Sequence, residues 1–165
     1  MPIDGLKGRT QKLEEIVRTP EEMNAIEDIK QLKARYFYCL DHKDWDGWRR
    51  DVFTPDASMD VQEASPTPYV GIEVILEFLI PLLDGVRTIH HGHMPIIELT
   101  SPTTAKGIWA MEDVLFWPEG RGGNVHGASG RVHGYGHYHE TYELTAGGWR
   151  IKSLRLTRLY GPAPL

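Results

Sequence analysis

The hydrophobic period of the chain changes near its middle, and this change limits the folds open to it. Apolar residues recur at helical spacing up to about residue 83, whereas later stretches alternate as β-strands do. The strand-like stretches are 86–99, 104–117, 131–145 and 148–160, with Gly- or Pro-containing separators between them. Helices followed by consecutive strands predict an α+β domain, in which helices pack on one face of a bent antiparallel sheet above a ligand pocket.

Start and stop signals predict three helices in the first half. Thr19-Pro20-Glu21-Glu22 supplies an N-cap, a first-turn proline and a capping-box glutamate, so a long helix begins there. The remaining pieces are a short helix at 45–53, a third helix at 71–83, and extended segments at 59–61 and 69–70. We expect residues 1–18 to form a flexible N-terminal arm, residues 19–160 one domain, and residues 161–165 a tail.

Composition limits the kinds of binding partner and the cellular compartment that we expect for this protein. A length of 165 residues suits one globular domain, and a net charge of -5 with scattered basic residues argues against a nucleic-acid partner. No segment predicts export or a membrane partner. Cys39 is the single cysteine and lies in an aromatic segment, so we expect a buried thiol in a reducing, cytoplasmic protein.

Polar side chains at the end of the long helix are candidates for acid/base chemistry. Tyr36 belongs to the apolar stripe of the helix, where its hydroxyl needs a partner. Asp41 lies about 140° further around an ideal helix, so the two side chains can converge only near the helix end.

Strand alternation places only one of two adjacent histidines on the inner face. His90 and His91 point to opposite sides unless a bulge at Gly92 changes the register. A carboxylate partner such as Asp41 would fix the tautomer of His90 and raise the basicity of its second ring nitrogen. The alternative for His90 is a core histidine that hydrogen-bonds to the backbone.

Asp113 lies on a strand face with large apolar residues, including Trp109 and Met111. An unpaired buried carboxylate is costly. Asp113 is therefore either neutralised by an arginine, such as Arg155 or Arg158, or takes part in catalysis.

The histidine-rich strands allow a metal site as an alternative. The segment His137–His139 followed by Glu143 is similar to the metal-binding pattern of cupins. However, Arg131 and Arg150 stand where that pattern needs glycine. We therefore expect structural or surface histidines, with no metal and no organic cofactor.

Several segments resemble the SnoaL-like, nuclear transport factor 2-like superfamily. IEDIKQLKARYFYCLDHKDWD resembles the first helix of its dehydratase branch, and TIHHGHMPIIEL, TTAKGIWAMEDVLFW, GYGHYHETYEL and GGWRIKSLRLTRLY resemble its strands. The resemblance covers residues 22–160. Within the superfamily, the chain is most similar to the bacterial bile-acid 7α-dehydratases and more distantly similar to the scytalone dehydratases.

The bile-acid dehydratase motifs map onto five residues of this chain. Tyr36 and Asp41 match Tyr-x-x-x-x-Asp, and His90 begins H-x-G-H-x-P, which favours His90 over His91. Asp113 follows a Trp-x-x-Glu segment, and Arg158 precedes an aliphatic residue and a tyrosine. The resemblance implies that these five residues are catalytic.

The resemblance also implies a fold and an assembly. It implies a cone-shaped barrel of curved antiparallel sheet packed against three helices, enclosing a deep hydrophobic pocket. It further implies a homo-oligomer, with a trimer favoured and a dimer possible. Residues 56–71, 118–130 and the C-terminal tail depart from the bile-acid enzymes, so the substrate stays open.

Together these observations predict a cofactor-independent dehydratase acting on a hydroxylated, hydrophobic cyclic substrate that is steroid-like or polyketide-like. His90 removes a proton beside a carbonyl, and Tyr36 donates a hydrogen bond; the role of Asp113 stays open. The expected substrate contacts are Phe78, Met94, Trp109, Met111 and Tyr138. The alternatives are a ketosteroid-isomerase-like isomerase or polyketide cyclase, and a non-catalytic small-molecule-binding domain.

Overall fold

The structure is a computed structural model that describes residues 18–62, 64–119 and 130–161. In these ranges there are three helices, α2 (Pro20–His42), α3 (Trp45–Asp51) and α4 (Ile72–Leu83). The strands are β1 (Phe53–Val61), β2 (Tyr69–Val70), β3 (Arg87–Ser101), β4 (Thr104–Phe116), β5 (Arg131–Thr145) and β6 (Gly148–Tyr160). Residues 1–17 of the predicted N-terminal arm (1–18), residues 120–129 of the Gly-rich segment, and residues 162–165 of the predicted tail lie outside the described residues.

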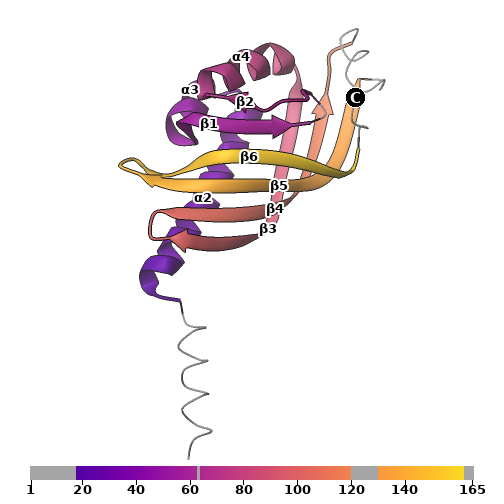
Figure 1. Cartoon of the computed structure of the whole chain (residues 1–165). Coiled ribbons are helices and arrows are strands. Elements are labelled where there is room, and N and C mark those ends of the chain that lie inside the picture. The colour runs from indigo at the N-terminus through magenta and orange to yellow at the C-terminus, as the bar shows by residue number, and fades with distance from the viewer. Residues whose placement is uncertain (1–17, 63, 120–129, 162–165) are drawn as a thin grey trace, which may run out of the picture.

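The strands form one curved, mixed sheet in the order β2-β1-β6-β5-β4-β3. The chain crosses one face of this sheet as α2, and the long strands bend around that helix (Figure 1). The predicted α+β class is confirmed. The prediction of a wholly antiparallel sheet was wrong at one junction, because β1 and β6 pair in parallel. The sheet is also open, with β2 and β3 as its edges.

The capping box predicted for the long helix is confirmed. The Thr19 hydroxyl accepts the Glu22 backbone N–H at 3.2 Å, and the Glu22 carboxylate accepts the Thr19 backbone N–H at 2.8 Å. The helix ends before Lys43, which takes a left-handed conformation with φ 60°. The predicted second helix is two residues too long, because buried Phe53 already begins β1.

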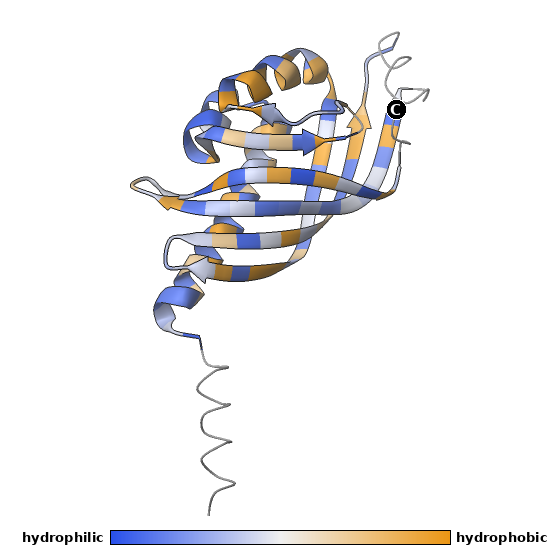
Figure 2. Cartoon of the chain, viewed as in Figure 1, coloured by the Kyte–Doolittle hydropathy of each residue, from blue (hydrophilic) through white to orange (hydrophobic). Residues whose placement is uncertain are grey.

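The core lies between the helices and the concave face of the sheet. α4 is almost wholly apolar, and the strands alternate apolar and polar residues (Figure 2). Ile29 of α2, Ile75 of α4 and Ile151 of β6 are fully buried. Burying each such side chain contributes about 1.5–3 kcal/mol to stability. Cys39 is also buried, as predicted.

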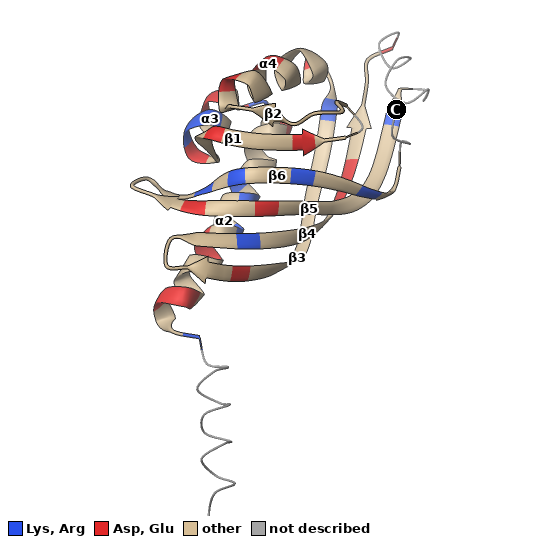
Figure 3. Cartoon of the chain, in the orientation of Figure 1, with Lys and Arg blue, Asp and Glu red and all other residues tan. Residues whose placement is uncertain are grey.

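Charged residues of both signs are interspersed on the strands. Lys and Arg of β4 and β6 lie among Asp and Glu of the neighbouring strands (Figure 3). None of the helices in the described ranges combines the length and apolar composition needed to cross a bilayer.

Candidate active site

Asp41 and His90 form a hydrogen-bonded pair between the end of α2 and β3. The Asp41 Oδ1 atom lies 2.6 Å from His90 Nδ1, and Asp41 Oδ2 accepts the His90 backbone N–H at 3.0 Å. A carboxylate only accepts hydrogen bonds, so Nδ1 carries the proton and Nε2 is the basic nitrogen. The His90 side chain is 8% exposed. This geometry holds the imidazole in one orientation, which is what a general base requires.

Neighbouring polar groups hold Asp41 in place. Thr88 donates its hydroxyl to Asp41 Oδ1 at 2.9 Å, and Lys43 Nζ donates to Thr88 Oγ1 at 2.7 Å. Burial alone would raise the pKa of Asp41, but the hydrogen bonds and charge of His90 outweigh it and hold the pKa below its ordinary value. The carboxylate is therefore ionised when it binds His90.

The depressed pKa of Asp41 predicts an acid-dependent contribution to stability. That contribution is present above the ordinary carboxyl pKa of about 4 and is lost as the pH falls through the lower folded-state pKa. Asp41→Asn should therefore reduce the free energy of unfolding by about 2 kcal/mol near pH 6 and by much less near pH 3. Urea unfolding of both proteins at the two pH values measures this gap. An equal gap at both would contradict the prediction.

Asp113 and Arg158 form a second buried pair on the same face. Arg158 donates from two guanidinium nitrogens to the two Asp113 oxygens, each at 2.7 Å. The Asp113 and Arg158 side chains are 4% and 15% exposed. Of the two arginines considered from the sequence, Arg158 is therefore the partner of Asp113. Arg155 instead lies 3.4 Å from Asp60.

The two pairs are neighbours across the sheet. His90 is the cross-strand partner of Asp113, which in turn pairs with Gly134 of β5. Directly opposed residues project to the same face, about 4.5–5.5 Å apart at Cβ. A Cβ atom at Gly134 would lie 2.4 Å from an Arg158 nitrogen, so glycine leaves the room that the arginine occupies. Sequence analysis missed Gly134, although a glycine inside a strand signals such a close approach.

Tyr36 is buried beside these pairs. Its ring packs against several aromatic rings, including those of Trp48 and Tyr138. Burial and the negative charge of Glu140 raise the pKa of Tyr36, while the nearby Tyr138 side chain opposes the rise. The hydroxyl therefore stays protonated and is a hydrogen-bond donor. The charges of the Asp41 and Asp113 carboxylates raise the pKa of Tyr36 further. Hydrogen bonds and cross-strand pairing join the other four predicted catalytic residues, and Tyr36 lies more than one turn before Asp41 on α2.

Three of the predicted substrate contacts lie on the inner face of the sheet. Trp109, Met111 and Tyr138 are 5%, 2% and 3% exposed. Phe78 lies elsewhere on α4, stacked on Tyr69 at 4.3 Å between ring centroids. The structure places these side chains, and their contact with a substrate stays a prediction.

Met94 corrects the sequence prediction, because its side chain is 91% exposed and does not face the interior. The register of β3 against β4 shifts between Gly92 and Pro95. Such an irregularity changes which side chains point inward. Ile97 is therefore buried on the inner face and Ile96 is exposed, the reverse of the grouping that simple alternation gives.

A buried charged network in the same core escaped sequence analysis. Lys33 Nζ lies 2.5 Å from Glu140 Oε1, and the other Glu140 oxygen accepts the Tyr142 hydroxyl. The Tyr142 oxygen accepts the Trp109 indole N–H at 2.8 Å. Burial lowers the pKa of Lys33 to about 8 despite the charge of Glu140. The missed signals are a lysine four residues after Ile29 on the buried stripe and a glutamate alternating with two tyrosines.

Two other histidines of the strands, on β5, have partners away from this cluster. His133 Nε2 lies 2.7 Å from Glu112, and His139 Nε2 lies 3.0 Å from the Thr157 hydroxyl. Hydrogen bonding by His133 lowers the pKa of Glu112. Within residues 18–62, 64–119 and 130–161, no three His, Cys, Asp or Glu side chains are grouped to hold a metal ion.

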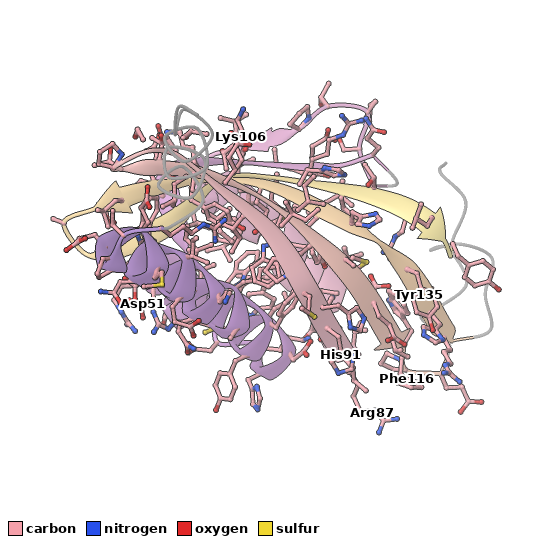
Figure 4. All side chains as sticks on the ribbon, turned by 90° about the horizontal axis from the view of Figure 1, so that it is seen from below. Asp51, Arg87, His91, Lys106, Phe116 and Tyr135 are labelled. Carbon is pink, nitrogen blue, oxygen red and sulfur yellow. The ribbon has the colours of Figure 1, made fainter. Side chains whose placement is uncertain are left out.

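A hollow of about 390 Å³ lies on the outer face of the sheet. Its lining includes Ile96, Lys106, Ile108 and His139, whose neighbours along each strand point into the core. Figure 4 labels Lys106 toward one end of the sheet and His91 and Phe116 toward the other. This hollow is therefore distinct from the inner face that carries His90.

Comparison with known proteins places the chain in a family. A 28% identical relative is the "Probable cyclase FGR4" of Gibberella zeae, aligned over 80% of this chain and 89% of that protein. The "Putative Scytalone Dehydratase" of Novosphingobium aromaticivorans has a TM-score of 0.75 at 18% identity, covering 90% of this chain and 92% of its own.

A further solved structure has the same fold. The hexachlorocyclohexane dehydrochlorinase LinA-type3 of Novosphingobium barchaimii has a TM-score of 0.70 at 19% identity, covering 88% of this chain and 92% of its own. The finer resemblance to bile-acid 7α-dehydratases stays a prediction. The SnoaL-like domain model matches residues 21–155, and the chain therefore belongs to the SnoaL-like family.

Proposed function

We propose that this protein is a cofactor-independent dehydratase that eliminates water from a hydroxylated, hydrophobic cyclic substrate. The observation that carries the proposal is the His90 imidazole, whose Nδ1 is bound to Asp41 and whose Nε2 is left as the base. An oriented base in a largely buried position is suited to proton abstraction from carbon. Apolar neighbours such as Trp109 and Met111 suit a cyclic substrate, which is steroid-like or polyketide-like.

The proposed reaction assigns each step to a residue of the site. His90 Nε2 takes the proton from the carbon beside the substrate carbonyl, and the electron pair of that bond moves toward the carbonyl oxygen to form an enolate. The enolate then returns its electrons to form the new carbon–carbon double bond as the bond to the β-hydroxyl breaks, and the hydroxyl leaves as water with the proton held by His90. Tyr36 donates its proton in a hydrogen bond to the developing enolate oxygen, a role suited to a phenol that stays protonated.

Asp113 acts in this proposal through Arg158. Both carboxylate oxygens accept from the guanidinium, so Asp113 can exchange a proton with a ligand only by breaking that pair. Arg158 brings positive charge to the side of the site where His90 and Asp113 are cross-strand neighbours. There it stabilises negative charge that develops on the substrate.

The comparisons support chemistry of this class and favour one second candidate. A neighbour of similar fold is named for scytalone dehydration, and another for elimination of hydrogen chloride. The 28% identical relative is named as a cyclase. The second candidate is therefore an isomerase or polyketide cyclase that uses the same base, since fold alone does not choose among these reactions.

Product mass separates the candidates. The protein is incubated with hydroxylated 3-oxo-steroids and aromatic polyketides, both free and as thioesters, and the products are analysed by mass spectrometry. We expect a loss of about 18 Da, one water, in which proton transfer to and from His90 takes part. A product of unchanged mass would instead identify an isomerase, or a cyclase that loses no water. Binding without turnover would contradict both proposals and identify a binding protein.

We also propose that the protein is cytoplasmic and forms a homo-oligomer through the outer face of the sheet, with a trimer favoured over a dimer. Met94 and Ile96 expose 91% and 72% of their surface on that face, beside the hollow described above. Neighbouring exposed apolar side chains favour a protein contact. Light scattering on the purified protein gives the mass that tests it.

A further inference from the structure

We infer that the buried Lys33–Glu140 ion pair positions the hydroxyls of Tyr36 and Tyr138. The inference deepens the proposed function and rests on it for the role of Tyr36, while the placement of the rings can be tested without any substrate. Lys33 and Glu140 are positioning residues in this account, because they act through the tyrosines.

The Lys33 ammonium lies over two tyrosine rings. Its Nζ atom is 3.8 Å from the centroid of the Tyr36 ring and 3.8 Å from that of the Tyr138 ring. A cation is attracted to the face of an aromatic ring, and the attraction is stronger where water is excluded. One buried charge therefore orients both ring planes, and with them the hydroxyls that the two rings carry.

The ammonium is itself fixed by a chain of partners. Glu140 binds Lys33 through one oxygen and the Tyr142 hydroxyl through the other, and Tyr142 is held by Trp109. Gly107 is opposite Glu140 across the strands, and a Cβ atom there would lie 2.8 Å from the Tyr142 hydroxyl. The missing side chain at Gly107 gives Tyr142 its place, so the position of the charge is set by the sheet.

Stability alone is a poor explanation for this pair. Both side chains are 0% exposed. Taking two charges out of water costs free energy that their mutual attraction only partly offsets. Proteins in which apolar residues of similar size replace such a pair are often as stable. An apolar pair would fill the same space between α2 and β5 but would exert no directional pull on the tyrosine rings. The pair thus adds orientation at the site of Tyr36.

The test uses a neutral replacement of the pair. Lys33→Met/Glu140→Gln removes both charges and keeps an acceptor for Tyr142. The protein is labelled with ring-¹³C tyrosine, and the signals of Tyr36 and Tyr138 are assigned with single Phe variants. We expect the signals of these two rings to shift and their ring flips to accelerate, while the exposed Tyr38 and Tyr160 stay unchanged.

A matched control separates the effect of losing the buried ion pair from the effect of losing any ion pair on α2. Glu27→Gln/Lys30→Met removes an exposed ion pair of the same helix, whose atoms are 3.4 Å apart, and should leave all tyrosine signals unchanged. If the first replacement fails to fold, Lys33→Met/Glu140→Leu is read in the same way. Unchanged Tyr36 and Tyr138 rings in a folded variant lacking the ion pair would overturn the inference.

Kinetics then connects ring placement with catalysis. Removing the pair should lower kcat roughly 10- to 100-fold at nearly constant KM, because a small misplacement of a catalytic donor is costly. In a Tyr36→Phe background the same replacement should cost much less, since the hydroxyl it positions is absent. Additive losses would show that the pair acts independently of Tyr36. An inactive wild type would instead reject the proposed function and leave the ring measurement valid.

Discussion

Replacing His90 by glutamine is expected to lower kcat by roughly 10²- to 10⁴-fold, the range that a positioned general base contributes. Glutamine can still donate a hydrogen bond to Asp41, which lies 2.6 Å from His90 Nδ1 in the native protein. It has no nitrogen that takes up a proton at neutral pH. The loss should therefore appear in kcat rather than in folding, and steady-state kinetics with far-UV circular dichroism measures both.

His91 supplies the matched control for this change. It follows His90 in β3, but its side chain is exposed on the opposite face. His91→Gln should leave kcat within about twofold of the wild type, because surface substitutions away from special features have small effects. Equal losses in the two variants, or full activity in His90→Gln, would remove His90 from the mechanism.

Much of this fold could be predicted from local signals. The capping box at Thr19 and the alternation within β4 and β5 are properties of short segments, and the structure confirms them. The parallel pairing of β1 with β6 is different, because it joins segments far apart in the chain. No periodicity within either segment reports which neighbour it pairs with or in which direction.

The candidate site likewise has residues that local motifs predict and residues whose placement depends on contacts between distant segments. Tyr36, Asp41 and His90 stand in short motifs that could be read directly, and the structure brings Asp41 and His90 together. Met94 was misplaced because a register shift in β3 depends on its pairing with β4. The alternation of apolar and polar residues within β3 does not reveal this register shift.

The interior charges were hidden for a second physical reason. Lysine and glutamate are mostly exposed, so Lys33 and Glu140 read as surface positions when taken singly. The two residues are 107 positions apart in the sequence, and the ion pair between them offsets part of the free energy that burying each charge costs. The need for glycine at positions 134 and 107 was hidden for the same reason. In each case a side chain from another strand or a distant position occupies the space where a Cβ atom would lie.

Lys33→Met alone is expected to cause the largest loss of stability, roughly 3–5 kcal/mol, because it leaves Glu140 charged and unpaired in the core. The Glu140 side chain is 0% exposed, so water cannot replace the ammonium without opening the packing between α2 and β5. Adding Glu140→Gln removes the orphaned charge and should restore most of the lost free energy of unfolding. Urea unfolding of the wild type, the single variant and the double variant measures both steps.

The exposed Lys30–Glu27 pair calibrates the result. Its side chains are 45% and 57% exposed, and pairs of this kind contribute about 0–1 kcal/mol. Lys30→Met should therefore change stability far less than Lys33→Met, although both replace a lysine of α2 by the same residue. A double variant as unstable as Lys33→Met would mean that the cost comes from lost packing of the lysine stem. Recovery of the free energy of unfolding on adding Glu140→Gln would show that the loss comes from the unpaired buried charge. Lys33 and Glu140 would then each be needed because each neutralises the charge of the other in the core.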